Sequence, residues 1–213
     1  SKLVYTSSPS VVFSGEDQQG ENELAPYPVE FLSPYPKSKA IAEKLILAAN
    51  SSSLATVALR PHLIWGPGDN HLVPRILDKG QKGKLRLVGK ENKLVDAVFI
   101  DNASDAHILA LEKLSNSSHI SGQVYFITNQ QPWAMCDIVN GILKAGGVKP
   151  VKKRIDSSLA YAIGGCLEVV YKAAKINAEP PMTRFLAKQL ATAHWYNPDK
   201  AQNELGSGCE IMR

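Results

Sequence analysis

The chain has 213 residues and a formal net charge of +4, from 24 Lys and Arg against 20 Asp and Glu. This small excess, with one dense basic cluster at residues 149–154, does not indicate a nucleic-acid partner. Cys136, Cys166 and Cys209 share no metal-ligand spacing and cannot all pair, so we expect neither a metal site nor a disulfide framework. No signal segment begins the chain, and no apolar run approaches the ~20 residues that span a bilayer. The composition therefore predicts a cytoplasmic globular protein with one core, or one large and one small lobe.

Along the chain, the apolar patterns alternate between strand and helix. We expect strands over residues 2–5, 54–60, 85–88, 94–100, 123–127 and 151–155, with the third and fourth around a turn at 89–92. We expect helices over residues 37–50, 71–79, 102–114, 133–144, 159–174 and 182–193. Residues 11–34 show no sustained period and predict a surface loop. This order is typical of an α/β protein.

Two polar residues near the middle of the chain have ordinary structural explanations. Asp101 precedes the helix over residues 102–114, and a cap explains its carboxylate fully. His107, on the same helix, is expected to be a partly buried structural histidine rather than a ligand or a base.

Tyr35 and Lys39 are candidates for proton transfer. If the segment from Pro36 onward is helical, the two side chains lie one turn apart on the same face. A phenol with a pKa near ~10 is a poor acid–base catalyst at neutral pH, and a nearby cation brings it closer to the working range. Spacing alone decides nothing, because it recurs at Tyr171/Lys175 and Tyr196/Lys200.

The context of the first pair is different. The predicted strand over residues 2–5 runs directly into the hydroxyl-rich residues 6–10, where a serine can meet the crevice in which open α/β sheets bind ligands. Neighbouring strand residues face opposite ways, so only one of Ser7 and Ser8 can do so, and we favour Ser8. An ordinary strand-end turn would also explain these serines, were it not for Tyr35 and Lys39.

An ordered set of motifs is similar to a known family. Strand and Ser-Ser come first, then Tyr-x-x-x-Lys, a buried strand, Arg60-Pro61 and Gly66-Pro67-Gly68. Together they resemble the extended short-chain dehydrogenase/reductase family. The passage from Val95 to His107 resembles its 3β-hydroxysteroid dehydrogenase branch. The resemblance covers most of the chain to about Gly206, after which the usual aromatic residue and proline are missing.

The resemblance implies roles for individual residues. Tyr35 would exchange a proton with a substrate oxygen, Ser8 would hydrogen-bond the same oxygen, and Lys39 would hold the nicotinamide ribose and lower the tyrosine pKa. Backbone groups of Pro61, His62 and Leu63 would meet the carboxamide edge of NAD or NADP. The reaction implied is the interconversion of a hydroxyl and a keto group on a bulky apolar, steroid-like substrate.

The resemblance also implies a fold and a missing part. We expect the C-terminal part of a Rossmann-type doubly wound parallel sheet, with residues 1–128 completing the dinucleotide-binding domain together with inserted substrate-lobe segments. Residues 129–213 would form mainly a smaller helical substrate lobe. No glycine-rich turn precedes Lys2, so the pyrophosphate site is expected in a preceding half, and this chain alone is expected to be inactive.

Other interpretations remain open. A sugar-nucleotide epimerase or dehydratase would keep the tyrosine and lysine, and the basic cluster at 149–154 could hold a diphosphate. A non-catalytic NAD(P)-binding protein would not need Ser8, Tyr35 and Lys39 together. The apolar run at 159–167 is flanked by lysines, so peripheral membrane contact is an alternative to the favoured role as core or pocket cover. A homodimer is compatible with the family.

Overall fold

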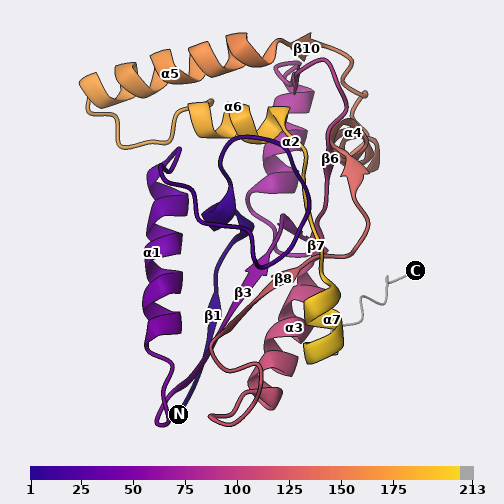
Figure 1. Ribbon diagram of the computed structural model, residues 1–213. Helices are drawn as coiled ribbons and strands as arrows, with labels where there is room; N and C mark the ends of the chain where they lie inside the picture. Colours follow the sequence, from indigo (N-terminus) through magenta and orange to yellow (C-terminus); the bar gives the residue numbers. More distant parts are fainter. Residues whose placement is uncertain (207–213) are drawn as a thin grey trace.

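The computed structural model describes residues 1–206, and their elements form an α/β fold (Figure 1). A three-stranded parallel sheet has β3 (Ala55–Pro61) at its centre, between β1 (Lys2–Thr6) and β8 (Gln123–Ile127). All seven residues of β3 are buried. A strand covered on both faces needs no alternation of apolar and polar residues, which explains its apolar run. The predicted α/β class with a parallel sheet is confirmed.

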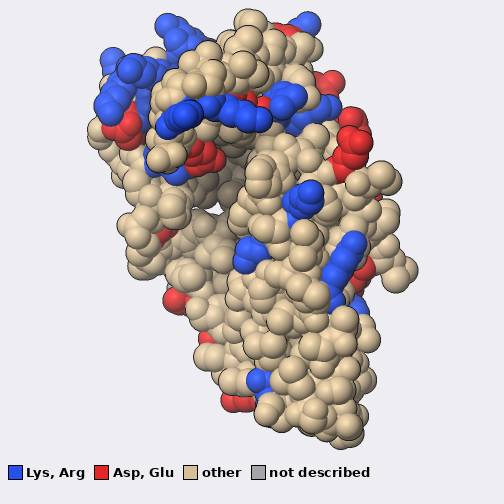
Figure 2. Space-filling model, turned by 90° about the vertical axis from the view of Figure 1, so that its left-hand side faces the viewer, with Lys and Arg blue, Asp and Glu red and all other residues tan. Residues whose placement is uncertain are grey.

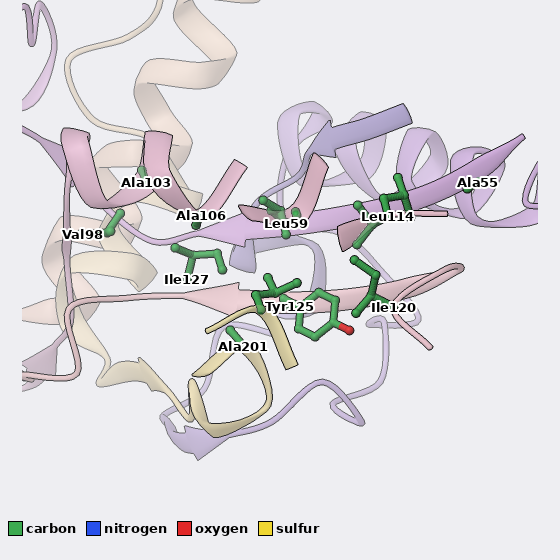
Figure 3. Packing of buried hydrophobic residues seen from close by; sticks show 13 residues of the cluster. Ala55, Leu59, Val98, Ala103, Ala106, Leu114, Ile120, Tyr125, Ile127 and Ala201 are labelled. Carbon is green, nitrogen blue, oxygen red and sulfur yellow. The ribbon is translucent and has the colours of Figure 1, made fainter. Parts of the chain in front are cut away.

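Helices cover both faces of this sheet. α1 (Pro34–Ala48) packs against β3 on one face, and α3 (Ile100–Lys113) and α7 (Asp199–Leu205) pack on the other. Successive strand residues point to opposite faces, so Leu59 of β3 joins the cluster with α3 and α7 while Arg60 reaches α1. Figure 3 shows side chains from β3, β8, α3 and α7 meeting in that cluster, among them Ala55, Ala103, Ala106, Tyr125, Ile127 and Ala201.

A smaller set of elements lies beyond the carboxyl ends of the sheet strands, and Figure 1 shows α5 (Ser157–Ala173) as its outermost helix. α5 packs on α6 (Arg184–Ala191), and α2 (Leu72–Gln81) packs on α4 (Met135–Ala145). Short strands connect them: β2 (Gln18–Glu21), β4 (Ile64–Trp65), β5 (Leu87–Val88), β6 (Leu94–Val95), β7 (Val98–Phe99), β9 (Trp133–Ala134), β10 (Arg154–Ile155) and β11 (His194–Tyr196).

The prediction of a surface loop over residues 11–34 is wrong for its first part. Val11, Val12 and Phe13 are buried, and Pro9–Val12 forms a 3₁₀-helix. β2 follows and pairs in parallel with β11, about 176 residues later in the chain, as from Gln18 to His194. A short strand paired with so distant a segment leaves no local period to detect.

Two details around residues 85–101 also differ from expectation. The strand expected over 94–100 is broken at Asp96 and Ala97 into β6 and β7, which pair with different strands. The buried Asp96 carboxylate at the break accepts from the Tyr196 backbone N–H. β5 pairs with β10, and β6 with β9 and β11, so the strands around the turn do not pair with each other. Asp101 does not cap α3: Phe99 holds that position, and Asp101 is exposed in the first turn.

The other predicted helices and strands begin and end within a few residues of their expected bounds. The sequence did not predict β4, β11 and α7, and β9 takes the first two residues of the helix expected over 133–144. Cys136 and Cys166 are free, and residues 1–206 hold no cluster of side chains suited to a metal ion. Within the same residues, no helix has both the length and the apolar character that crossing a membrane requires. Cys209 and the unusual ending after Gly206 lie outside the described residues.

Candidate active site

A cleft of about 450 Å³ opens where the main sheet meets the smaller elements. One side carries Ser8, Ser10, Tyr35 and the turn at residues 61–63, which follow the carboxyl ends of β1 and β3 or begin α1. The opposite side is formed by α2, α4 and α6. This is the end of a parallel sheet at which α/β proteins bind ligands.

Tyr35 lies in the cleft wall, in the first turn of α1, with 52% of its surface exposed. Lys39 is one turn further along the same helix and is half-buried beside the cleft rather than in its wall. Its Nζ donates to the carbonyl oxygen of Thr6 at 2.9 Å and lies 5.3 Å from the ring centre of Tyr5. The ammonium is therefore held between α1 and the end of β1.

The two competing tyrosine–lysine spacings do not form the same arrangement. Tyr171 is in α5, and Lys175 lies beyond the end of that helix. Tyr196 is in β11 and Lys200 is in α7. Neither pair shares one helix face, so context separates three spacings that look identical in sequence.

A buried ion pair fixes α1 to the sheet. Arg60 of β3 donates from Nε to Glu43 Oε2 at 3.0 Å and from Nη2 to Oε1 at 2.6 Å, and both residues are almost fully buried. The Tyr27 hydroxyl donates to Glu43 Oε1 at 2.6 Å, and burial together with this carboxylate raises the pKa of Tyr27 to about 12. Glu43 lies one turn after Lys39, so this cluster fixes the helix that carries both candidate residues.

Ser8 and Ser7 have different surroundings, although the sequence left a choice between them. Ser8 lines the cleft, and its Oγ accepts from the N–H of Ser10 at 3.2 Å and from the Ser10 hydroxyl at 2.9 Å. Because both bonds use its lone pairs, its own O–H is free to donate into the cleft. Ser7 is buried away from the cleft, and its Oγ has no hydrogen-bond partner among the described residues. Ser10, which the sequence did not single out, therefore orients Ser8.

The turn at residues 61–63 brings backbone to the same cleft. His62 N–H donates to the carbonyl of Ile127 at 3.1 Å, and Leu63 has a left-handed φ of 44°. Within the described part of the chain, the N–H of Leu63 finds no acceptor. The turn therefore offers a backbone donor to a molecule bound in the cleft.

Beneath this turn lies a group of buried polar side chains that the sequence did not reveal. His62 Nδ1 contacts Asp96 Oδ1, and His62 Nε2 lies 3.1 Å from Nδ1 of His194. His194 Nε2 bonds the carbonyl oxygen of Gln189 at 2.8 Å. The partners are 34 and 132 residues apart, so no local motif signals the group.

The predicted structural role of His107 is consistent with its contacts. It is half-buried, does not line the cleft, and bonds the Thr6 hydroxyl at 2.8 Å and the Ala103 carbonyl at 2.7 Å. These bonds join α3 to β1 and leave neither ring nitrogen for a ligand.

The opposite wall is apolar with a basic fringe. Its side chains include Leu72, Ile76, Leu87, Ile138, Val139, Leu186 and Leu190. Lys79 of α2 also lines it, half-buried and without an ion-pair partner among the described residues, while Arg75 lies 3.7 Å from Glu179. Figure 2 shows Lys and Arg side chains gathered at the end of the molecule where α5 lies, with a hollow below them. The cleft suits a mainly apolar molecule with one negative group.

α5 does not cover the cleft as predicted, and it contributes little to the core, where Ala160 packs in a buried cluster with Val88 and Ala187. Among its residues only Ala160 and Gly164 are buried, and none of the described cleft residues comes from it. Gly164 lies directly against the backbone of Thr183, so that a β-carbon there would come within 2.6 Å of it. Small residues on one face of α5 allow it to pack closely on α6, and most of its larger apolar residues are exposed on the other face.

The parallel sheet, with a cleft at the carboxyl ends of its strands, has the architecture of the extended short-chain dehydrogenases/reductases. Residues 1–157 match the model of the 3-beta hydroxysteroid dehydrogenase/isomerase family. The chain belongs to this family.

Curated relatives give the comparison more detail. The 2-alkyl-3-oxoalkanoate reductase of Shewanella oneidensis is 52% identical over an alignment that covers 96% of this chain and 55% of the relative. The mouse sterol-4-alpha-carboxylate 3-dehydrogenase, decarboxylating, is 33% identical over 96% of this chain and 58% of its own length. The chain therefore spans little more than half the length of these relatives.

Solved structures share the fold at lower identity. UDP-glucuronic acid 4-epimerase from Bacillus cereus, in complex with NAD, has a TM-score of 0.67 and 20% identity, covering 99% of this chain and 56% of its own. The dTDP-glucose 4,6-dehydratase from Bacillus anthracis, also with NAD, has a TM-score of 0.64 and 21% identity, covering 96% and 55%. These likenesses establish the fold alone.

Proposed function

We propose that this chain is the C-terminal part of a nicotinamide-dependent oxidoreductase that interconverts keto and hydroxyl groups on bulky apolar oxo acids. The observation that carries the proposal is the convergence of Ser8, Tyr35 and the turn at 61–63 on one cleft whose far wall is apolar. The relatives support the class, because the two that are named above act, by their names, on a 3-oxoalkanoate and on a sterol carboxylate.

The residues of the chain have distinct tasks in this proposal. The Ser8 hydroxyl donates to the substrate carbonyl oxygen, and Tyr35 gives its phenolic proton to the same oxygen during reduction or takes it back during oxidation. Lys39 favours the tyrosinate by its charge and binds the ribose hydroxyls. NAD or NADP, when bound, supplies or accepts the hydride at the carbonyl carbon. Pro61, His62 and Leu63 hold its carboxamide edge.

The far wall supplies substrate choice. Its leucine, isoleucine and valine side chains suit long alkyl groups or a sterol skeleton, and both named relatives act on molecules with a carboxylate close to the reacting carbon. Arg86 and Arg154 also line the cleft without an ion pair, but they bond uncharged oxygen atoms, whereas the Lys79 ammonium has no hydrogen bond or ion pair among the described residues. We assign Lys79 to the substrate carboxylate. A steroid without a carboxylate would leave this half-buried ammonium without a partner.

Two parts are assigned by the same proposal. Residues 1–128 complete the dinucleotide-binding domain with inserted substrate-side segments, and residues 129–213 supply mainly the substrate lobe, although α7 packs back onto β8. Pyrophosphate binding is assigned to a preceding half, so residues 1–213 produced alone should bind NAD and NADP far more weakly than the full-length protein. Calorimetric titration of both proteins tests this, and equal affinities would contradict it.

Incubation of the full-length protein with a reduced nicotinamide dinucleotide and a long-chain 2-alkyl-3-oxoalkanoate tests the function. We expect the matching 3-hydroxy acid by mass spectrometry, with one dinucleotide oxidised per product. A sugar-nucleotide panel tests the alternative of an epimerase or dehydratase, which the fold alone allows. Conversion of sugar nucleotides only would overturn the proposal, and tight dinucleotide binding without any turnover would favour the non-catalytic alternative.

The exposed face of α5 suggests where the protein works. Leu159, Ile163, Val169 and Val170 repeat at helical spacing on the side away from α6, with Val169 68% and Val170 54% exposed. Lys172 follows on the same helix, and more lysines lie beyond both ends. An apolar stripe flanked by cations fits the surface of an anionic membrane, so we assign α5 to peripheral membrane contact.

Vesicle flotation of the full-length protein tests this assignment. Mixed phosphatidylcholine–phosphatidylglycerol vesicles should carry the wild type upward and leave a Val169→Glu/Val170→Glu variant behind. Val29→Glu, which adds a charge to an exposed apolar residue in the loop before α1, is the matched control and should float like the wild type. Equal flotation of wild type and double variant, or none of either, would contradict it.

A further inference from the structure

A chain of buried hydrogen bonds joins the two walls of the cleft, and the proposed reaction gives it no role. It runs from Asp96, in the break between β6 and β7, through His62 and His194 to the carbonyl of Gln189 in α6. His62, Asp96 and His194 are 7%, 1% and 5% exposed. Asp96 Oδ2 also accepts from the N–H of Tyr196 at 2.9 Å, so three segments distant in sequence, at residues 62, 96 and 189–196, meet here.

The Gln189 carbonyl sets the direction of the hydrogens in this chain. A carbonyl only accepts, so His194 carries a proton on Nε2. Burial lowers the pKa of His194 to about 3, the ring is neutral, and its Nδ1 is an acceptor. His62 must then donate from Nε2. At the other end of the chain, His62 Nδ1 contacts Asp96 Oδ1.

The ends of the chain belong to opposite sides of the cleft. His62 is part of the turn at 61–63 on the sheet side, while α6 contributes Phe185, Leu186, Gln189 and Leu190 to the far wall. We infer that His194, acting through His62, is a positioning residue that fixes α6 against the 61–63 turn and so sets the width of the apolar cleft. His194 also lines the cleft, but its hydrogen bonds go to His62 and Gln189 and not to Ser8 or Tyr35, so we expect its effect to be on substrate binding.

Two variants of the full-length protein separate the hydrogen bonds from the packing. His194→Phe keeps a ring beside Phe13 and His62 but can neither accept nor donate. His194→Gln offers an amide oxygen to His62 and an amide N–H to the Gln189 carbonyl, as the neutral imidazole does. We expect the phenylalanine variant to raise KM for the oxo acid about tenfold with kcat within about threefold, and the glutamine variant to restore most of KM.

His107→Phe is the matched control, because it also removes two histidine hydrogen bonds but at a place outside the cleft. KM should not change there. Equal KM in all variants, or a fall in kcat that glutamine does not restore, would overturn the inference.

The kinetic readout rests on the proposed function, and a second measurement does not. Nitrogen-15 spectra of histidine-labelled wild-type protein should show His194 as the neutral Nε2–H form from pH 5 to 8, and His62 protonated on Nε2. A protonated His194 or the opposite tautomer would overturn the inference even if the protein turns over no oxo acid.

Discussion

The two sides of the cleft are built in different ways. The sheet side rests on long, paired strands: β3 is hydrogen-bonded on both edges and buried throughout, and Arg60 holds α1 to it through Glu43. The far side is made of helices joined by two-residue strands such as β5 and β10. The sheet side holds Tyr35 in a fixed position, whereas the far side can differ in sequence between proteins with different substrates.

The ion pairs on the two sides sharpen this difference. Glu43→Gln leaves the Arg60 guanidinium buried with a neutral partner, and we expect a loss of about 3–5 kcal/mol in the free energy of unfolding. Glu168→Gln removes the partner of Arg184, which is half exposed on the far side, and should cost much less. Denaturant unfolding of both variants measures the two losses in the free energy of unfolding. Equal losses would contradict the expected difference between the two sides.

The junction between the sides should respond to pH. The pKa of His194 is lowered to about 3 in the folded protein. Below pH ~6.5, His194 therefore binds a proton in the unfolded chain but stays neutral in the folded chain. This contribution to stability is complete above pH ~6.5 and is lost as the pH falls, by up to about 2 kcal/mol at pH 5. Two other titratable groups act on the pKa of His194: His62, which is 3.1 Å away and lowers it, and Asp17, which raises it and is paired with Lys93.

Unfolding of the wild type and His194→Phe at pH 7 and pH 5 measures this dependence. The variant should lose less stability than the wild type over this interval. An identical loss in both proteins would mean that His194 does not titrate as its burial requires.

The far wall should respond to the charge of the substrate. Lys79→Met removes the ammonium that we assign to the substrate carboxylate and should raise KM for an oxo acid about fivefold to tenfold. KM for the corresponding methyl ester should be the same in Lys79→Met and the wild type. Lys82→Met is the control, since that lysine pairs with Asp78 outside the cleft. A KM unchanged by Lys79→Met would show that Lys79 does not bind the substrate carboxylate.

The sequence predicts the sheet side well for a physical reason. β1, β3, β8 and α1 are long enough to show their periods, and the Ser8, Tyr35 and 61–63 positions that it singles out do line one cleft. Of the predicted cofactor contacts, Tyr35, Pro61, His62 and Leu63 line this cleft, and Lys39 lies beside it. That Ser8, rather than Ser7, hydrogen-bonds the substrate oxygen remains a prediction. The Ser8 hydroxyl proton, which is free to donate into the cleft, supports it.

The sequence predicts the far side and the junction poorly. β2 and β11 have three or four residues each and pair across the whole chain, and the bonds of His62, Asp96 and His194 depend on that pairing. Asp101 looked like a helix cap, but α3 begins at Ile100, directly after β7 and two residues earlier than the predicted helix. The outward face of α5 could not be separated from core, since an apolar helix stripe does not say what covers it.

Replacement of Tyr35 by Phe in the full-length protein tests the central claim most directly. The hydroxyl is removed with little change in volume at a half-exposed position, so the midpoint of thermal unfolding should not move. The rate of keto reduction should fall by about 10²–10⁴-fold, the contribution of a positioned acid–base group. Tyr171→Phe, in α5 and outside the cleft, should leave the rate unchanged. Equal rates for Tyr35→Phe and the wild type would remove Tyr35 from the reaction.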